Sequence, residues 1–167
     1  MKAIIVLGSA RSFGHTRKAV DQAFKGLDIP LIDLNTKVIK PYDYAYQNQE
    51  DDFIPLIETI LPYELLILAT PVYWYSMSAP MKTFIDRFSD LLAIRKDLGR
   101  QLRGKKLFVV STFDTSYPRG FEDTFEQTCT YLGMSYLGTS FIYSGTTSLE
   151  FLNNNPAQLA KAQALFA

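Results

Sequence analysis

The sequence predicts an α/β protein in which helices cover both faces of a five-stranded parallel sheet. Short apolar runs alternate along the chain with segments whose apolar residues recur at helical spacing. The run AIIVL at 3–7 is apolar at every position, which is typical of a strand covered on both faces. At 167 residues the chain is long enough for one well-packed domain, which we expect to span 1–167.

Each predicted strand is a short apolar run that ends at polar or turn-forming residues. In chain order these runs are AIIVL at 3–7, LIDL at 31–34, ELLILA at 64–69, KLFVVST at 106–112 and SYLGTSFIYS at 135–144. Strands that alternate with helices favour parallel pairing, and parallel sheets bind ligands beyond the carboxyl ends of their strands. We therefore expect the site at the loops that follow the first, third and fourth strands.

Each predicted helix has apolar residues three or four positions apart. The helices are expected at 15–27, 53–61, 81–92, 121–132 and 156–166, with the clearest pattern at 81–92. Asp51 and Asp52 supply an N-cap for the second helix, and Asn155 supplies one for the last, where Pro156 takes the first position. The tyrosine-rich stretch 35–50 has no period and is expected to be a loop.

Composition and charge exclude several classes of protein. Lysine plus arginine and aspartate plus glutamate number 17 each, so no net field attracts the protein to nucleic acid or a membrane. The single cysteine, Cys129, can form no internal disulfide and hold no metal cluster by itself, which fits a reducing cytoplasm. The apolar run after Lys2 is too short for a secretory signal. We expect a cytoplasmic protein without a metal.

The loop GSARSFGHT at 8–16 joins the first strand directly to the first helix. Free backbone N–H groups and the positive end of the helix dipole point into such a loop and favour an anion. The loop adds hydroxyl, guanidinium and glycine groups that suit a phosphate: Ser9, Arg11, Ser12, Gly14 and Thr16. It is neither a Walker A loop nor a dinucleotide fingerprint. A capped helix start with a solvent-exposed arginine is the alternative interpretation.

The second loop, TPVYWYSMSAPMK at 70–82, places three consecutive aromatic residues, Tyr73, Trp74 and Tyr75, after a buried strand. A site for a planar heterocycle needs backbone polar groups at the edge of the ring and apolar surface against its face. This loop offers both. The same aromatic residues also suit the core or a subunit contact, so both interpretations stay open.

Together the two loops resemble those of the flavodoxin-like NAD(P)H-dependent FMN reductases and quinone reductases. The resemblance covers nearly the whole chain and is strongest over 4–19 and 64–88. In the second loop and its helix it rests on Pro71, Tyr73, Pro80, Lys82, Asp86 and Arg87. It implies a flavodoxin-like three-layer sandwich with strand order 2-1-3-4-5, and a homodimer or larger homo-oligomer with the flavin near the interface.

The resemblance implies that the first loop binds the FMN phosphate and that the second lines the isoalloxazine ring. The residues expected to bind FMN are Ser9, Arg11, Ser12, Gly14, His15, Thr16, Pro71, Val72, Tyr73, Trp74, Tyr75, Ser76, Thr112, Asp114 and Tyr117. No catalytic side chain is expected, because the flavin carries the chemistry. Lys82, Asp86 and Arg87 are interpreted as structural.

Three stretches depart from the family's pattern. His15 stands where the family usually has Asn, and TFDTSYPRG at 112–120 stands where many relatives have a glycine-rich turn. The stretch 40–52 resembles the part of the iron–sulfur flavoproteins that carries closely spaced cysteines, but it has Tyr42 and Tyr44 instead, which excludes an iron–sulfur cluster. These tyrosines are expected to wall the substrate side of the site or a partner's surface.

The implied function is that of an FMN-dependent oxidoreductase. NADPH or NADH would give a hydride to the flavin, which would pass electrons to a quinone, free flavin or another small acceptor. Two alternatives stay open: a flavodoxin-type electron carrier, and an interaction module of the same fold that has lost the cofactor. The neutral charge and Arg11 argue against the carrier, and the intact loops argue against the module.

Overall fold

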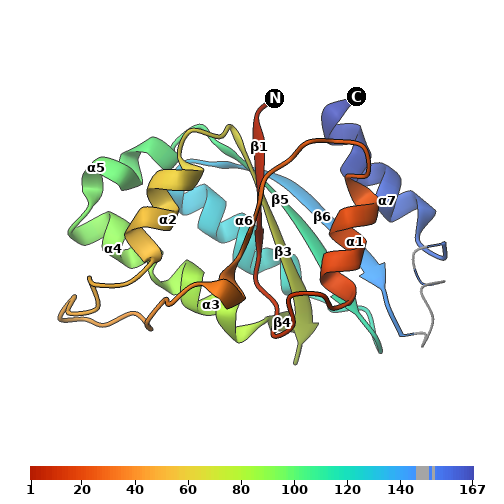
Figure 1. Ribbon diagram of the computed structural model, residues 1–167, viewed down its shortest axis with the longest axis horizontal. Helices are drawn as coiled ribbons and strands as arrows, with labels where there is room; N and C mark the ends of the chain where they lie inside the picture. The colour runs from red at the N-terminus through yellow and green to blue at the C-terminus, as the bar shows by residue number, and fades with distance from the viewer. Residues whose placement is uncertain (146–150, 152) are drawn as a thin grey trace.

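The parallel strands of the sheet pair in the order β2-β1-β3-β5-β6, which confirms the order predicted from the sequence (Figure 1). The strands are β1 (Ala3–Leu7), β2 (Leu31–Asp33), β3 (Leu65–Tyr73), β5 (Lys106–Phe113) and β6 (Ser135–Tyr143). This computed structural model describes residues 1–145, 151 and 153–167. Every residue of β1 is buried, as its continuous apolar run predicts.

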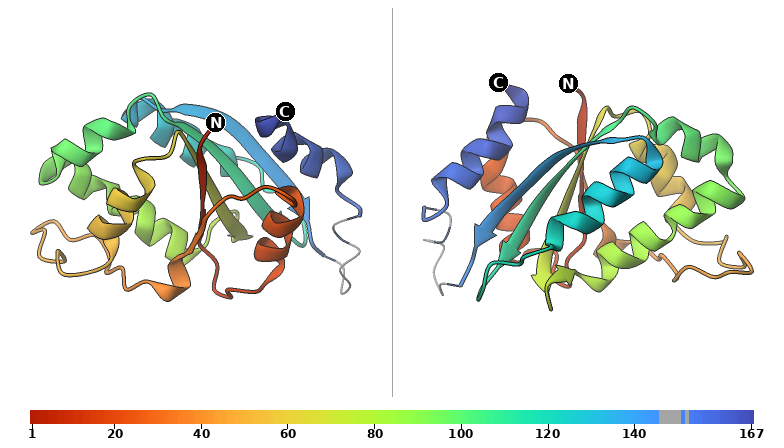
Figure 2. Two further views of the ribbon diagram at one scale, coloured as in Figure 1. Left: turned by 45° about the horizontal axis from the view of Figure 1, so that its top comes forward. Right: turned by 180° about the vertical axis from the view of Figure 1, so that it is seen from behind.

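Helices cover both faces of the sheet, as Figure 2 shows. On one face lie α1 (His15–Ala23) and α7 (Pro156–Gln163), and on the other lie α2 (Phe53–Ile60), α3 (Ala79–Asp86), α4 (Phe88–Ala93) and α6 (Phe121–Leu132). Shorter helical turns are η1 (Leu34–Thr36), α5 (Lys96–Gly99), η2 (Arg100–Leu102) and η4 (Ala164–Phe166). Alternate residues of β1 face opposite layers: Ile4 packs with α2 and α3, whereas Ile5 packs with α1 and α7.

Two predicted helices have different bounds in the structure. The helix expected over 15–27 ends at Ala23, and Gly26 beyond it has a positive φ of 85°. The helix expected over 81–92 is interrupted at Arg87, which ends α3 and begins α4. The buried guanidinium of Arg87 forms ion pairs with Asp51 and Asp90, so its interactions hold the chain where the two helices meet.

The segment 70–79, expected to be a loop, is a β-hairpin. Strand β3 continues to Tyr73 and pairs with the short antiparallel strand β4 (Ser76–Met77). The turn consists of Trp74 and Tyr75, with φ values of 50° and 63°. Positive φ at both central residues is the pattern of a type I′ turn, whose twist matches that of paired strands.

Asp52 and Asn155 take the predicted N-cap positions of α2 and α7, but neither side chain caps its helix. Asp52 precedes α2, but it is the Asp51 carboxylate that accepts the N–H of Phe53 at 3.0 Å. Asn155 precedes α7, but its side chain bonds to the backbone N–H and C=O of Tyr143, both at 3.0 Å. Among the residues that the structure describes, no helix combines the length and hydropathy of a membrane span.

Candidate functional site

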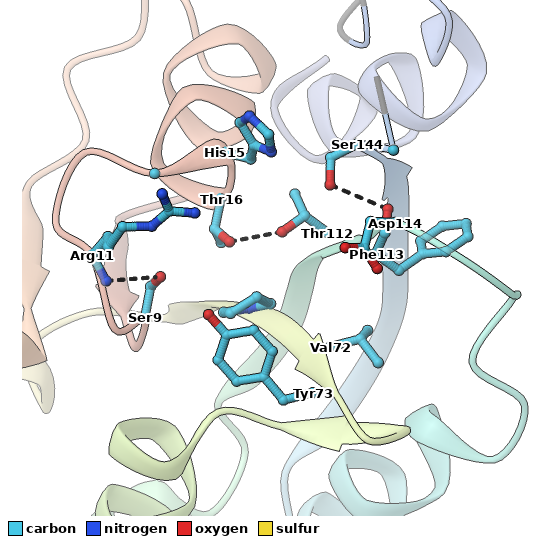
Figure 3. A pocket seen from close by; sticks show the side chains of 13 residues that line it. Ser9, Arg11, His15, Thr16, Val72, Tyr73, Thr112, Phe113, Asp114 and Ser144 are labelled. Carbon is cyan, nitrogen blue, oxygen red and sulfur yellow. Dashed lines mark hydrogen bonds between the residues drawn. The ribbon is translucent and has the colours of Figure 1, made fainter. Parts of the chain in front are cut away.

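A cleft of about 380 Å³ opens at the carboxyl ends of β1, β3, β5 and β6, beside the start of α1 (Figure 3). It is lined by Ser9, Arg11, Gly14, His15, Thr16, Pro71, Val72, Tyr73, Thr112, Phe113, Asp114, Ser144 and Gly145. Val72, Tyr73, Phe113 and Asp114 also line a neighbouring groove of about 570 Å³, together with Trp74, Tyr75, Thr115 and Ser116. The two cavities therefore form one continuous depression along the edge of the sheet.

One end of the cleft provides donors for an anion. Gly14 takes the N-cap position of α1, where no side chain caps the helix, so the N–H groups of its first turn have no intrahelical partner. The exposed Arg11 lies beside them, and none of the ion pairs among the described residues involves it. The hydroxyls of Thr16 and Thr112 are buried and lie 2.7 Å apart. This end suits a phosphate group.

The first loop is held in place by α3 and β3. The carbonyl oxygen of Gly8 accepts the buried hydroxyl of Ser78 at 2.6 Å, and the Gly8 N–H donates to Ala69 at 2.8 Å. A Cβ at Gly8 would lie 2.8 Å from the Cβ of Met81, so only glycine allows α3 to approach this closely. These contacts fix the position of the first loop at the cleft.

His15 lies at the rim of the cleft, where its ring packs against Phe151 with ring centroids 5.0 Å apart. This contact joins the start of α1 to Phe151, which follows β6 in the chain. It supplies a structural reason for an aromatic ring at this position. His15 is also part of the lining of the cleft.

The groove end is apolar and aromatic. Tyr73, Trp74 and Tyr75 are all exposed, Trp74 to 95%. The hydroxyl of Tyr75 lies 3.3 Å from that of Ser116, so the β3–β4 turn and the loop after β5 meet across the groove. Left-handed backbone costs roughly 1–2 kcal/mol for an ordinary residue. The turn therefore carries strain at the residues that present these aromatic rings, which is a common feature of binding sites.

The structure brings most of the predicted FMN-binding residues together and places three outside both cavity linings. Ser12 lies 3.5 Å from Asn35, and Ser76 pairs with Tyr73 in the hairpin. Tyr117 packs against Phe113 and Phe141, with ring centroids 6.1 and 5.0 Å apart. The linings also contain residues that were not assigned to the cofactor from the sequence: Phe113, Thr115, Ser144 and Gly145.

Arg87 is structural, as expected. Its side chain is 1% exposed and forms ion pairs with Asp51 at 2.5 Å and with Asp90 at 2.8 Å. It also donates to the carbonyl oxygens of Lys40 and Asn48. Burial opposes the charged form of Asp51, but the Arg87 guanidinium and two backbone N–H groups outweigh it and lower the pKa of Asp51. This cluster anchors the tyrosine-rich segment 40–51 to the helices.

The tyrosines of that segment line neither cavity. Tyr42 packs against Tyr44 and Tyr46, with ring centroids 5.1 and 5.9 Å apart. The Tyr42 hydroxyl donates to Tyr46, and this hydrogen bond is the main cause that raises the pKa of Tyr42 to about 12. These residues therefore do not wall the substrate side within this chain. The other expectation, a surface that contacts a partner, stays a prediction, and it fits the 88% exposure of Tyr44.

An uncapped helix start beside the Arg11 guanidinium, next to an aromatic groove, forms a site that suits a phosphorylated planar ligand. The comparisons with known proteins agree. The family model described as NADPH-dependent FMN reductase matches residues 1–147. The chain belongs to the NADPH-dependent FMN reductase family. It is accordingly an oxidoreductase with FMN as its cofactor.

Relatives support the same family. The chain is 33% identical over 149 residues to YwqN of Bacillus subtilis (strain 168), named as an NAD(P)H-dependent FMN-containing oxidoreductase. The alignment covers 83% of this chain and 82% of YwqN. The chain is 34% identical over 100 residues to an iron-sulfur flavoprotein of Archaeoglobus fulgidus, covering 52% of this chain and 45% of that protein. The solved Trp repressor binding protein of B. subtilis matches with a TM-score of 0.76 and 28% identity, covering 99% of both chains. The flavodoxin-like fold is thereby confirmed.

Proposed function

We propose that this protein binds FMN in the cleft and groove and uses NADPH or NADH to reduce a quinone, free flavin or another small acceptor. The observation that carries the proposal is the continuity of the two cavities. A guanidinium and an uncapped helix start lie at one end, and aromatic surface lies at the other. A flavin mononucleotide has the same order of groups, a phosphate at one end and a planar ring at the other.

At the phosphate end, the chain's own groups neutralise and orient a dianion. The N–H groups at the start of α1 and the guanidinium of Arg11 supply charge-assisted hydrogen bonds. Ser9 and Thr16 are buried at this end of the cleft and can add hydroxyl donors. Because Gly8 and Ser78 fix the loop beforehand, little ordering entropy is lost when the phosphate binds.

At the ring end, the β3–β4 hairpin and the loop after β5 bound the site. Val72 and Phe113 supply apolar surface, and the backbone beside them supplies polar groups for the edge of a ring. FMN, when bound, supplies the chemistry of hydride acceptance and electron transfer. The groove has a volume of about 570 Å³, so a nicotinamide and then an acceptor can reach the ring in turn. This openness favours an enzyme over a carrier with an enclosed flavin.

The oligomeric state and location are part of the same proposal. Phe13, Trp74 and Tyr75 are 80%, 95% and 59% exposed, and aromatic residues are enriched at the cores of protein interfaces. We place the interface of a homodimer on this aromatic edge, in the cytoplasm where NADPH and NADH are available. Replacing Trp74 with Ser should shift the mass measured by light scattering toward that of a monomer.

The first test separates the phosphate end from the ring end. The purified protein is titrated with FMN and with riboflavin, which lacks the phosphate, and binding is followed by flavin fluorescence. Arg11→Ala should weaken FMN binding by about tenfold or more, the loss of one charged hydrogen bond, and leave riboflavin binding unchanged. Arg17→Ala is the control, because Arg17 lies nearby on α1 but pairs with Asp21 outside the cleft lining. Equal losses of FMN and riboflavin in Arg11→Ala would contradict the assignment of the phosphate end.

A second test separates the enzyme from the alternatives. The FMN-loaded protein is mixed with NADPH or NADH without oxygen, and the flavin absorbance is followed. Bleaching, followed by recovery when a quinone is added, supports the reductase. Bound flavin that neither nucleotide bleaches would indicate an electron carrier, and failure to retain FMN would indicate an interaction module.

A further inference from the structure

Asp114 occupies a special place in the site, because it lines both the cleft and the groove. Among the residues that the structure describes, Arg11 and Asp114 are the only lysine, arginine, aspartate or glutamate residues in the two linings. Figure 3 shows them on opposite sides of the pocket, with Thr16 and Thr112 between them. The depression is therefore electrically polar, with a cation at the phosphate end and a carboxylate where the two cavities meet.

The carboxylate of Asp114 is not neutralised by a neighbour in the part of the chain that the structure describes. Within that part, its side chain takes part in no hydrogen bond or ion pair, and the residue is exposed. In contrast, its backbone is held firmly. The carbonyl oxygen of Phe113 accepts both the N–H and the hydroxyl of Ser144, at 2.7 and 3.1 Å. A Cβ on Gly145 would clash with the carbonyl oxygen of Asp114, so glycine lets β6 close against this loop.

A ligand that spans the cleft and the groove must pass Asp114. If its phosphate lies at Arg11, its ring system lies at the Asp114 side of the depression. This step rests on the proposed function, since it uses FMN as the ligand. The charge of the carboxylate then acts on the ring and not on the phosphate.

We propose that Asp114 lowers the reduction potential of bound FMN. The oxidised ring is uncharged. Reduction by two electrons with uptake of one proton gives an anionic ring, and uptake of a second proton gives a neutral one. The fixed negative charge of Asp114 disfavours the anion, so the site holds oxidised FMN more tightly than reduced FMN. The bound flavin is thereby made a stronger reductant toward its acceptor.

The expected size of the effect follows from the exposure of Asp114. Two unit charges a few ångströms apart in water interact strongly enough to change an equilibrium by roughly threefold to fivefold. For a two-electron couple, this corresponds to roughly 15 to 20 mV, since a tenfold change is about 30 mV. Salt must reduce the effect, because the screening length falls to about 3 Å at 1 M.

The test measures the dissociation constants of oxidised and of dithionite-reduced FMN, without oxygen, for the wild type and for Asp114→Asn. The ratio of the reduced to the oxidised constant should fall roughly threefold to fivefold in Asp114→Asn at low salt, and this difference should shrink at 1 M NaCl. Asp114→Glu keeps the charge and should keep the wild-type ratio. Asp28→Asn is the matched control, because Asp28 is an exposed aspartate near Pro30, at the opposite edge of the sheet.

The outcomes distinguish this inference from the function on which it rests. If the wild type binds FMN but Asp114→Asn leaves the ratio unchanged, the inference is overturned and the proposed function stands. A ratio that changes equally in Asp28→Asn also overturns it, because the effect would then come from the net charge. If the wild type binds neither form of FMN, both fail together.

Discussion

Removing the guanidinium of Arg87 should destabilise the protein more than any surface substitution. Arg87→Met keeps most of the side-chain volume, but it removes the guanidinium that lies over the Phe53 ring and leaves Asp51 and Asp90 without their cation. The three side chains are 1%, 0% and 2% exposed, so the two carboxylates cannot recover their hydration without opening the structure. Breaking a buried ion pair by removal of one partner costs about 3–5 kcal/mol. At about 2–4 °C per kcal/mol for a chain of this size, the Tm should fall by roughly 6–20 °C.

The assay is thermal and urea unfolding of the FMN-free protein, since a bound ligand would add its own stabilisation. Lys82→Met is the matched control: it breaks the exposed pair with Asp86 on the same helix and should cost about 0.5 kcal/mol or less. The triple variant Arg87→Met, Asp51→Asn, Asp90→Asn should recover part of the loss, because it removes the stranded charges. A loss below about 1 kcal/mol in Arg87→Met would refute the reasoning, since it would mean that the cluster is hydrated.

Three further predictions concern the site and the pH dependence of stability. Trp74→Asn together with Tyr75→Gly gives the strained turn the preferred residues of a type I′ turn, so it should raise the free energy of unfolding by about 1–2 kcal/mol in a thermal melt. The same double variant should weaken FMN binding in a fluorescence titration. A loss of stability would show that the aromatic turn is not strained. Thr16→Val should cost about 1–2 kcal/mol in urea unfolding, because it leaves the buried hydroxyl of Thr112 unpaired, and adding Thr112→Val should recover part of it. The pKa of Asp51 is lower in the folded protein than its ordinary value, so its contribution is complete above about pH 5 and is lost as the pH falls through the lowered value. Acid titration of stability should therefore show a smaller decline in Asp51→Asn than in the wild type.

The strands and the position of the cleft could be predicted from the sequence because both depend on local patterns, whereas the order of the strands came from the family resemblance. Apolar runs such as 3–7 and 64–69 identify the strands, and the loops that follow them must lie at one edge. Ser144 and Gly145 follow the fifth strand and line the same edge, so the rule that indicated the other loops could have included them.

The features that could not be predicted depend on contacts between distant segments. The break at Arg87 reflects an ion pair with Asp51, 36 residues away, which no periodicity reports. The direction of a loop side chain also cannot be predicted from the sequence. Tyr117 lines neither cavity and packs against Phe141 of β6. The hairpin at 70–79 was hidden because bulky residues rarely take positive φ, so propensity argues against a turn at Trp74 and Tyr75.

The residues of the 64–88 segment that do not touch the cleft nevertheless help to build it. Ser78 bonds to Gly8 and so fixes the phosphate end from the beginning of α3. At the other end of α3, Arg87 bonds to the segment 40–51. Between Ser78 and Arg87, the apolar face of α3 packs on the sheet. The hairpin that presents Trp74 lies directly before this helix. One short segment therefore positions the first loop, the aromatic turn and the tyrosine-rich segment together.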